Sequence, residues 1–270
     1  MTMLRQYLRR LDLTIGERLI QETLRVQFNI RLGGDSAQQP STIRIYNLAE
    51  DTASIMTVTD NAVSLSAGYA DTLTGLIYEG QVRRGDTERH GLDRITTLAL
   101  GNSDSQKATI FTRSYAHISL RDIIRDISGI MGLAVHPSIS IVPQETLAEW
   151  SYIGRCRDAL DALLTPRGIH WHTTSQSIMF GAAASGTPNT GSFTLSQASG
   201  LIGSPARTED GMKAKMVLNA DIDVGQTIIM DSVYLTGGYT VKTVLHHGDT
   251  WEGEWATDVE AIRSVTGDDV

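Results

Sequence analysis

The sequence predicts a mainly β protein in which a small α+β module separates two β segments. Alternating apolar and polar residues dominate the chain between Leu4 and Leu100, the pattern of strands with one buried face. Long stretches with a helical spacing of apolar residues occur only in the middle of the chain. The sequence also holds 25 glycines against 6 prolines, which suits many tight turns because glycine reaches positive φ without steric cost.

The first segment is predicted to hold six or so strands in a small barrel or sandwich. Its clearest strand, residues 24–32, alternates strictly and ends at the turn Gly33-Gly34-Asp35. A later hairpin is expected to turn near Gly85 and Asp86. The predicted strands cover residues 7–15, 24–32, 42–48, 63–69, 76–85 and 93–101, and a short helix covers residues 49–57.

The middle segment begins after a polar break at residues 102–106. Residues 119–133 place their apolar side chains on one helical face, with Ser119 as the N-cap and Gly132 as the C-terminal stop. A second helix over residues 152–164 carries an apolar stripe that includes Ile153 and Cys156. It leads into a hairpin of residues 169–173 and 177–180. These elements predict an α+β module.

The last segment follows a small, polar and flexible connection over residues 181–191. The final two strands predict a β-hairpin around a turn at His246-His247-Gly248-Asp249, with Trp251 and Trp255 on one face of the sheet. The expected strands are residues 212–218, 227–231, 233–235, 239–245 and 250–257. The chain is therefore divided into residues 1–103, 104–185 and 186–270.

Composition narrows the class of protein. Lys and Arg number 23 against 31 Asp and Glu, for a net charge of -8, which opposes binding to a phosphate backbone. The single cysteine excludes an internal disulfide and fits assembly in a reducing cytoplasm. No signal peptide is expected at the N-terminus, and no run of about 18 apolar residues predicts a membrane-spanning helix.

Several residues could carry chemistry, and each has a simpler structural interpretation. His170 and His172 share a strand face and could hold zinc, but no third ligand is identifiable. Asp221 and Asp223 lack the remaining ligands of a calcium loop, so a turn is favoured. Cys156 is expected to be a packed thiol.

No motif for enzyme chemistry is present. His246 and His247 face opposite sides of a strand, and no nucleophile accompanies either of them. We therefore predict no catalytic residue, no cofactor-binding residue, no metal site and no enzymatic activity. A basic cluster is predicted to solvate a loop or to grip an acidic partner, and the four tryptophans are core or interface anchors. The cluster comprises Arg83, Arg84, Arg89, His90 and Arg94, and the tryptophans are Trp150, Trp171, Trp251 and Trp255.

The succession of motifs resembles the late-control or baseplate-hub proteins of Mu-like and other contractile-tailed bacteriophages. Four stretches carry the resemblance. They are Ser-Leu-Arg-Asp-Ile-Ile-Arg-Asp-Ile-Ser from residue 119, Arg-Cys-Arg-Asp-Ala-Leu-Asp-Ala-Leu-Leu from residue 155, Gly-Ile-His-Trp from residue 168, and the ending Gly-Gly-Tyr to Trp-x-Thr from residue 237.

The resemblance implies tube-type β-barrels at residues 1–103 and 186–270, and a homotrimer whose six barrels match a six-fold tail tube. It implies contacts with a distal tail or tail tube protein, with a spike or other tip protein and with the tape measure protein. DNA would be transient cargo in the lumen, and no membrane contact is implied. The location would be the tail tip or baseplate of a virion assembled in the bacterial cytoplasm. A glycan-binding or cell-wall hydrolase module and the hub of a contractile secretion system are the alternatives.

Overall fold

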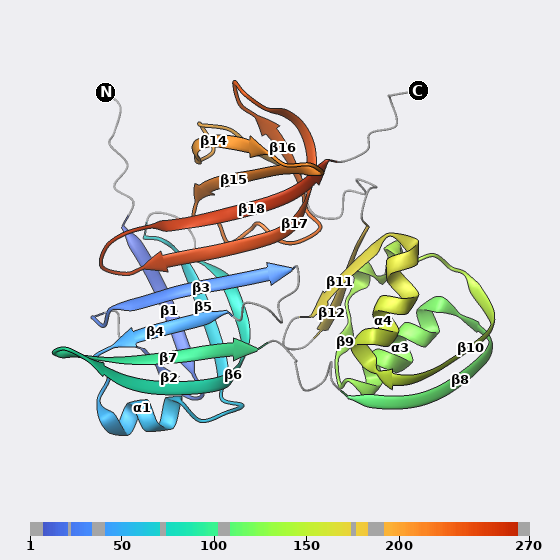
Figure 1. Ribbon diagram of the computed structural model, residues 1–270, viewed down its shortest axis with the longest axis horizontal. Helices are drawn as coiled ribbons and strands as arrows, with labels where there is room; N and C mark the ends of the chain where they lie inside the picture. Colours follow the sequence, from blue (N-terminus) through green and yellow to red (C-terminus); the bar gives the residue numbers. More distant parts are fainter. Residues whose placement is uncertain are drawn as a thin grey trace.

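The computed structural model describes residues 8–20, 23–33, 41–70, 74–101, 109–173, 177–182 and 192–263. Two β regions lie against each other, and an α+β module stands beside them (Figure 1). Each of the three regions has its own buried apolar cluster. The predicted mainly β fold with an α+β insert is confirmed, while the domain boundaries and the tube-type barrels stay predictions.

The first β region is built on strands that alternate buried and exposed residues, as the sequence predicted. In β3, for example, Val26, Phe28 and Ile30 are buried and the residues between them are not. A short helix covers one end of this region (Figure 1). The elements are β1 (Arg9–Ile15), β2 (Arg18–Leu19), β3 (Val26–Gly33), β4 (Thr42–Tyr46), α1 (Glu50–Met56), β5 (Ala62–Tyr69), β6 (Gly75–His90) and β7 (Asp93–Gly101).

The predicted turn at Gly85 and Asp86 is wrong. Strand β6 passes through these residues and turns only at Gly91 and Leu92, where Gly91 has φ of 64°. Gly85 serves close packing instead, because a Cβ atom there would lie 2.5 Å from the Cα of Thr57. Glycine inside a strand can therefore mark a close approach of two backbones and not a turn.

The α+β module packs two helices against a two-stranded ribbon, β8 and β10, and a small sheet. The first helix is confirmed with its predicted N-cap, since the Asp122 amide donates to Ser119 Oγ at 3.2 Å. Gly132 follows the helix with φ of 69°, as a C-terminal stop requires. The elements are β8 (Ile110–Ser119), α3 (Leu120–Ile130), β9 (Ala134–Val135), η1 (Pro137–Ile141), β10 (Thr146–Arg155), α4 (Cys156–Leu164), η2 (Thr165–Arg167), β11 (Ile169–Thr173) and β12 (Ser177–Ala182).

The second helix begins at Cys156, not at Tyr152 as predicted. Residues 152–155 belong to β10, whose aromatic rings Trp150 and Tyr152 stack with centroids 5.5 Å apart on the side facing the helices. Ile153, assigned to the helical stripe, is 78% exposed on the other side of the ribbon. The strand was missed because its period-two pattern merges into the helical stripe at Cys156.

In residues 192–263, the last β region has the six strands β13 to β18, of which β13 and β14 were not predicted. The strand expected at residues 233–235 is instead a turn, in which the Ser232 amide donates to the Leu235 carbonyl at 3.1 Å. The elements are β13 (Phe193–Leu195), β14 (Leu201–Arg207), β15 (Gly211–Val217), β16 (Thr227–Asp231), β17 (Thr236–Asp249) and β18 (Trp255–Arg263).

The predicted hairpin turn at residues 246–249 is also misplaced. These residues lie within β17, and the chain turns at residues 250–254 before β18 begins at Trp255. Strand β17 extends this far because it pairs with β18 on one side and with β3 on the other. Pairing with a strand more than 200 residues away in sequence leaves no signal in the local pattern.

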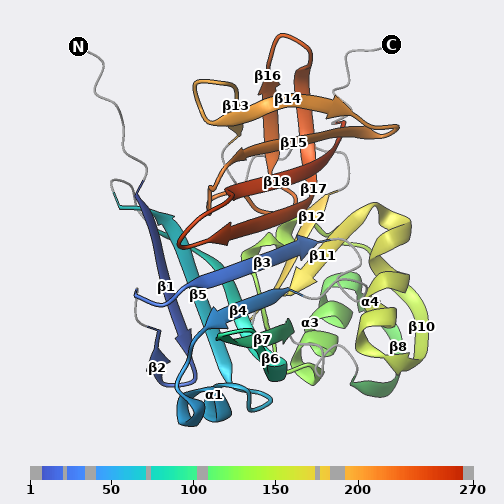
Figure 2. The same ribbon diagram turned by 60° about the vertical axis from the view of Figure 1, so that its left-hand side comes forward.

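Pairing of β3 with β17 makes the two β regions one sheet. Its strand order is β14-β15-β18-β17-β3-β4-β7-β6-β5-β1-β2, with β16 and β13 branching from β17. Figure 2 shows β15, β18, β17, β3 and β4 as neighbouring strands across the boundary between the two regions. We call the β3–β17 pairing the seam.

Candidate functional site

The seam is an antiparallel ladder that runs from Gly33 paired with Thr243 to Gln27 paired with Asp249. Gly248 lies within this ladder, where a Cβ atom would be 2.5 Å from Trp255 Cε3 and 2.8 Å from Phe28 Cζ. Only glycine lets these two rings approach the strand so closely. The seam thus requires glycine at position 248 for this packing.

Trp255 locks the last β region onto the core of the first. Its ring is 6% exposed, belongs to the first apolar cluster and meets Phe28 edge to face at a centroid distance of 5.1 Å. Its indole N–H donates to the Gly68 carbonyl at 3.2 Å. Tyr69 adds a second link, because its hydroxyl accepts from the Leu218 amide at 3.2 Å. The junction is therefore a shared core and not a surface contact.

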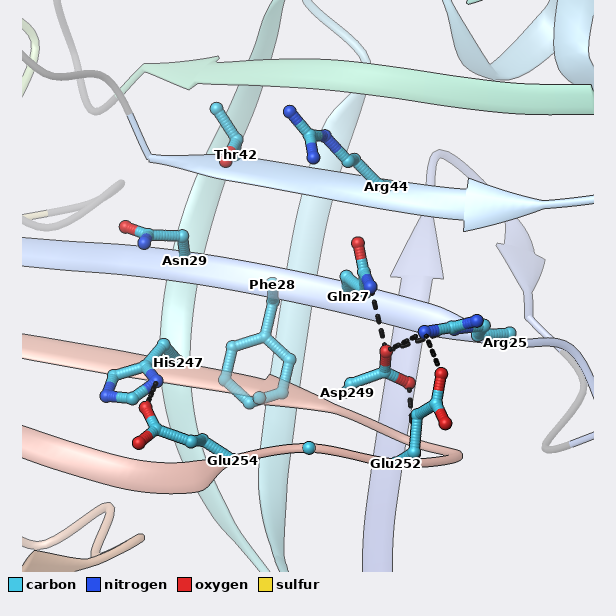
Figure 3. Close-up of a pocket in the computed structure, with 12 residues that line it drawn as sticks. Arg25, Gln27, Phe28, Asn29, Thr42, Arg44, His247, Asp249, Glu252 and Glu254 are labelled. Carbon is cyan, nitrogen blue, oxygen red and sulfur yellow. Dashed lines mark hydrogen bonds and ion pairs between the residues drawn. The ribbon is translucent and has the colours of Figure 1, made fainter. Parts of the chain in front are cut away.

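Asp249 is the polar centre of the seam (Figure 3). Its carboxylate accepts hydrogen bonds from Arg25 Nη2 at 2.7 Å, from Gln27 Nε2 at 2.8 Å and from the Trp251 amide at 2.9 Å. Burial opposes ionisation of this carboxyl, but the Arg25 and Gln27 hydrogen bonds outweigh it and hold its pKa below the ordinary value. Arg25 also pairs with the exposed Glu252 at 2.9 Å.

Further hydrogen bonds fix the loop that follows Asp249. The Val26 amide donates to Thr250 Oγ1, and the Thr250 amide donates to the Val26 carbonyl, both at 3.0 Å. Arg9 of β1 reaches across and donates to the carbonyls of Asp249 at 2.6 Å and Gly253 at 2.5 Å. We call residues 250–254 the tip loop.

Sequence reasoning missed this cluster. The alternation of apolar residues in β3 places Arg25 and Gln27 on one face of the strand, and that was the only available signal. Their partner Asp249 lies 224 residues from Arg25, and it was assigned to a turn.

Substituting Asp249 by Asn is expected to lower the free energy of unfolding by about 2 kcal/mol. The change leaves the guanidinium of Arg25 without its buried partner, and the partial exposure of Arg25 reduces the cost below that of a fully buried pair. Urea unfolding at pH 7 measures the loss. The matched control Glu252→Gln removes only the exposed arm of the same network and should cost less than about 0.5 kcal/mol. Equal losses for the two variants would contradict this assignment.

The outward face of the joined sheet is polar on both sides of the seam. One row of paired residues runs from Asp249 through Gln27, Arg44 and Thr97 to Asp86. The next row on the same face contains His247, Asn29, Thr42, Ala99 and Arg84. An open groove of about 610 Å³ lies over these rows beside the tip loop (Figure 3).

His246 and His247 face opposite sides of β17, as predicted. His246 is fully buried, its Nδ1 lies 2.9 Å from Thr257 Oγ1, and its Nε2 has no hydrogen-bond partner among the described residues. Burial, with a smaller contribution from His247, lowers the pKa of His246 to about 4. His247 lies on the polar face and contacts Asp258 at 3.1 Å and Glu254 at 3.5 Å.

The other candidate residues have structural surroundings. His170 pairs with Gly181 and His172 with Met179 in the predicted hairpin, and the structure describes only their backbone. Asp221 and Asp223 lie in a turn, where Asp223 Oδ1 accepts from the Val224 amide at 2.7 Å. Cys156 is buried, as predicted, and burial raises the pKa of its thiol.

Two surface features differ from the predictions. The arginines of the β6–β7 hairpin do not form one patch, because Arg84 and Arg89 alternate onto opposite faces and Arg94 pairs with Glu50 of α1 at 3.5 Å. Trp251 is 64% exposed in the tip loop, whereas Trp255 is buried. The two rings, predicted to share one face of the sheet, therefore do not form one exposed aromatic surface.

No group of three or more His, Cys, Asp or Glu side chains suited to a metal ion occurs in the described residues. Among the helices that the structure describes, none has the length and apolar character needed to cross a membrane.

The described residues form a sheet shared by two β regions, with a polar outward face on both sides of the seam. The family model for baseplate hub gp41 matches residues 8–246. The chain belongs to this baseplate hub family, which confirms the family resemblance. Its role is structural, in a phage baseplate or tail tip.

Solved structures share the fold at low sequence identity. The 43 kDa tail protein of prophage MuSo2 from Shewanella oneidensis is 9% identical with a TM-score of 0.64, covering 94% of this chain and 96% of the other. A tail protein from Neisseria meningitidis MC58 is 8% identical with a TM-score of 0.63, covering 95% and 97%.

The E. coli c3393 protein, described as a type VI secretion component with similarity to T4 tail proteins gp27 and gp5, is 12% identical with a TM-score of 0.63. The match covers 93% of this chain and 76% of the c3393 chain. Comparison with curated protein sequences gives no match.

Proposed function

We propose that three copies of this chain form a ring with pseudo-six-fold symmetry that joins the tail tube to the spike or tip. Each copy contributes its two β regions, so that three chains supply six β units. The ring works by shape, and the chain has no enzymatic activity. It is part of the virion, and it is assembled in the bacterial cytoplasm.

The continuous sheet is the observation that carries this proposal. Pairing at the seam and the buried Trp255 hold the two β regions together, so that each chain would enter the ring as one unit. Among the described residues, the sheet ends in β14 at one side, and β1 pairs with β2 only at Thr14 and Ile15 at the other. Unpaired strand edges are sites where another chain can add to a sheet. Joining β14 of one copy to the β1 side of the next would close the ring.

The polar face of the sheet suits the wall of a DNA channel. Its rows combine uncharged side chains with charges of both signs, and Asp249 in the first row is already paired with Arg25 at 2.7 Å. Such a surface offers no basic track that would hold a phosphate backbone, and the net charge of -8 repels it. DNA would therefore pass as transient cargo.

The neighbours of the ring would be a distal tail or tail tube protein on one side and a spike or other tip protein on the other, with the tape measure protein as a further partner. The hub of a contractile secretion system is the second candidate, favoured by the fold shared with the c3393 protein. Gene neighbourhood separates the two candidates.

Native mass spectrometry of the purified full-length chain tests the ring. A mass of three chains supports the proposal, and a second measurement at higher ionic strength shows whether the trimer depends on surface charges. A species that remains a single chain at every concentration, in the presence and absence of tail proteins, would overturn it.

A further inference from the structure

The tip loop presents an exposed tryptophan on a rigid support. Trp251 is 64% exposed, although tryptophan is among the residues that gain most from burial. The loop beneath it is held by Asp249, Thr250 and Arg9 through the hydrogen bonds described above. A loop already fixed in one conformation loses little entropy when a partner binds, and tryptophan is the residue type most enriched among binding hot spots.

A second exposed apolar side chain lies at the same end of the sheet. The register places Asp249 beside Gln27, Gln27 beside Arg44 and Arg44 beside Thr97. The tip loop after β17 and the β6–β7 turn before β7 therefore lie at the same end of the sheet. Leu92 in that turn is fully exposed. Both turns lie at the left of Figure 1. By strand spacing, β17 and β7 are about 14 Å apart.

This end of the sheet points away from the edges that would join copies. Strands of a ring closed edge to edge run obliquely to its axis, so their end loops project from its two flat faces. The argument rests on the ring of the proposed function. Trp251 would then face the next component along the tail axis and not another copy within the ring.

Acidic side chains outnumber basic ones around the two apolar residues, although Lys215 pairs with Glu254 at 2.8 Å and Arg89 is exposed near Leu92. Glu252 is 73% and Glu254 62% exposed in the tip loop, and further exposed carboxylates flank the β6–β7 turn. These are Glu50, Asp51, Glu88 and Asp93. The partly buried Arg25 and Arg94 neutralise some of this charge from beneath. A partner with an apolar pocket inside a basic rim would complement this end.

We propose that the tip loop is the anchor by which the ring docks the adjoining tail protein, with Trp251 inserted into an apolar pocket bordered by lysines or arginines. Leu92 is the second anchor. The partner is a protein component of the tail, because an exposed tryptophan on a fixed loop, surrounded by polar residues, is the pattern of a protein–protein hot spot.

The test uses tails purified from cells that lack this chain, to which the full-length protein is added. Binding is measured by co-sedimentation for wild type, Trp251→Ala and Tyr234→Ala. Tyr234 is the matched control, because it is 70% exposed in the β16–β17 loop at the other end of β17. Loss of a tryptophan hot spot should weaken binding by roughly 10-fold to 30-fold, whereas Tyr234→Ala should leave it within about 2-fold.

Thermal unfolding shows whether Trp251→Ala keeps its fold, as its exposure predicts. Acrylamide quenching adds an independent readout, because Trp251 fluorescence should become protected when tails bind. Equal binding by Trp251→Ala and wild type, or a loss confined to Tyr234→Ala, would overturn the proposal. Competition by soluble peptidoglycan fragments that depends on Trp251 would overturn it in favour of a glycan ligand.

The oligomeric state is recorded separately for the same samples. A trimer that binds tails without regard to Trp251 contradicts this docking surface and leaves the ring intact. A monomer whose binding to tails depends on Trp251 contradicts the ring and leaves the anchor intact.

Discussion

Replacing Trp255 by alanine is expected to lower the free energy of unfolding by about 4 kcal/mol, the typical cost of removing a buried aromatic ring. The change opens a cavity beside Phe28 and leaves the Gly68 carbonyl without its indole donor. Because Trp255 belongs to β18 but packs in the first core, both β regions should lose stability together. Urea unfolding followed by circular dichroism measures the effect.

Trp251→Ala is the matched control for this substitution. It removes the same side chain four residues earlier, at a position that is 64% exposed, and should change stability by less than about 0.5 kcal/mol. Trp255→Phe should be intermediate, because it keeps most of the ring and loses the hydrogen bond. Equal effects of the two alanine variants would show that Trp255 does not join the two β regions.

Acidification from pH 7 to pH 4 is expected to cost about 3 kcal/mol of stability through His246. Its pKa falls from an ordinary 6.5 to about 4 in the folded protein. The unfolded chain therefore binds a proton below pH 6.5 that the folded chain refuses, and stability decreases as the pH falls through this window. The loss is complete below about pH 4, where both states are protonated.

His246→Leu should flatten this decline, because the side chain no longer titrates. His247→Gln is the control, since His247 lies on the polar face beside Asp258 and Glu254. Urea midpoints measured at intervals between pH 7 and pH 4 distinguish the two variants. An unchanged decline in His246→Leu would show that another group is responsible. Asp249 contributes at lower pH. Its pKa in the folded protein is below the ordinary carboxyl value, so its ionised form stabilises the fold above that value. This stabilisation is lost as the pH falls from the ordinary carboxyl pKa to the lowered one.

The local sequence pattern was enough to predict those elements whose buried and exposed faces follow their own alternation of apolar and polar residues. Strand β3 was predicted because one of its faces packs on a core and the other is polar along its whole length. Helix α3 was predicted because its stripe, its Ser119 cap and Gly132 all lie within one short stretch. These features depend on neighbours in sequence.

The seam could not be predicted because it depends on residues that are far apart in the sequence. Residues 246–249 look like a turn when β17 and β18 are considered alone, and only β3 on the other side makes them a strand. The same applies to Gly85, whose role depends on Thr57. The Arg25–Asp249 cluster joins residues 224 positions apart, so its parts were visible in the sequence and their proximity was not.

The most direct test of the central claim is imaging of the purified chain by electron cryomicroscopy. Class averages should show closed rings with three-fold symmetry, in which six β units surround an open channel and the polar face of the seam lines it. Single arcs that never close, or rings in which the seam faces outward, would contradict the account.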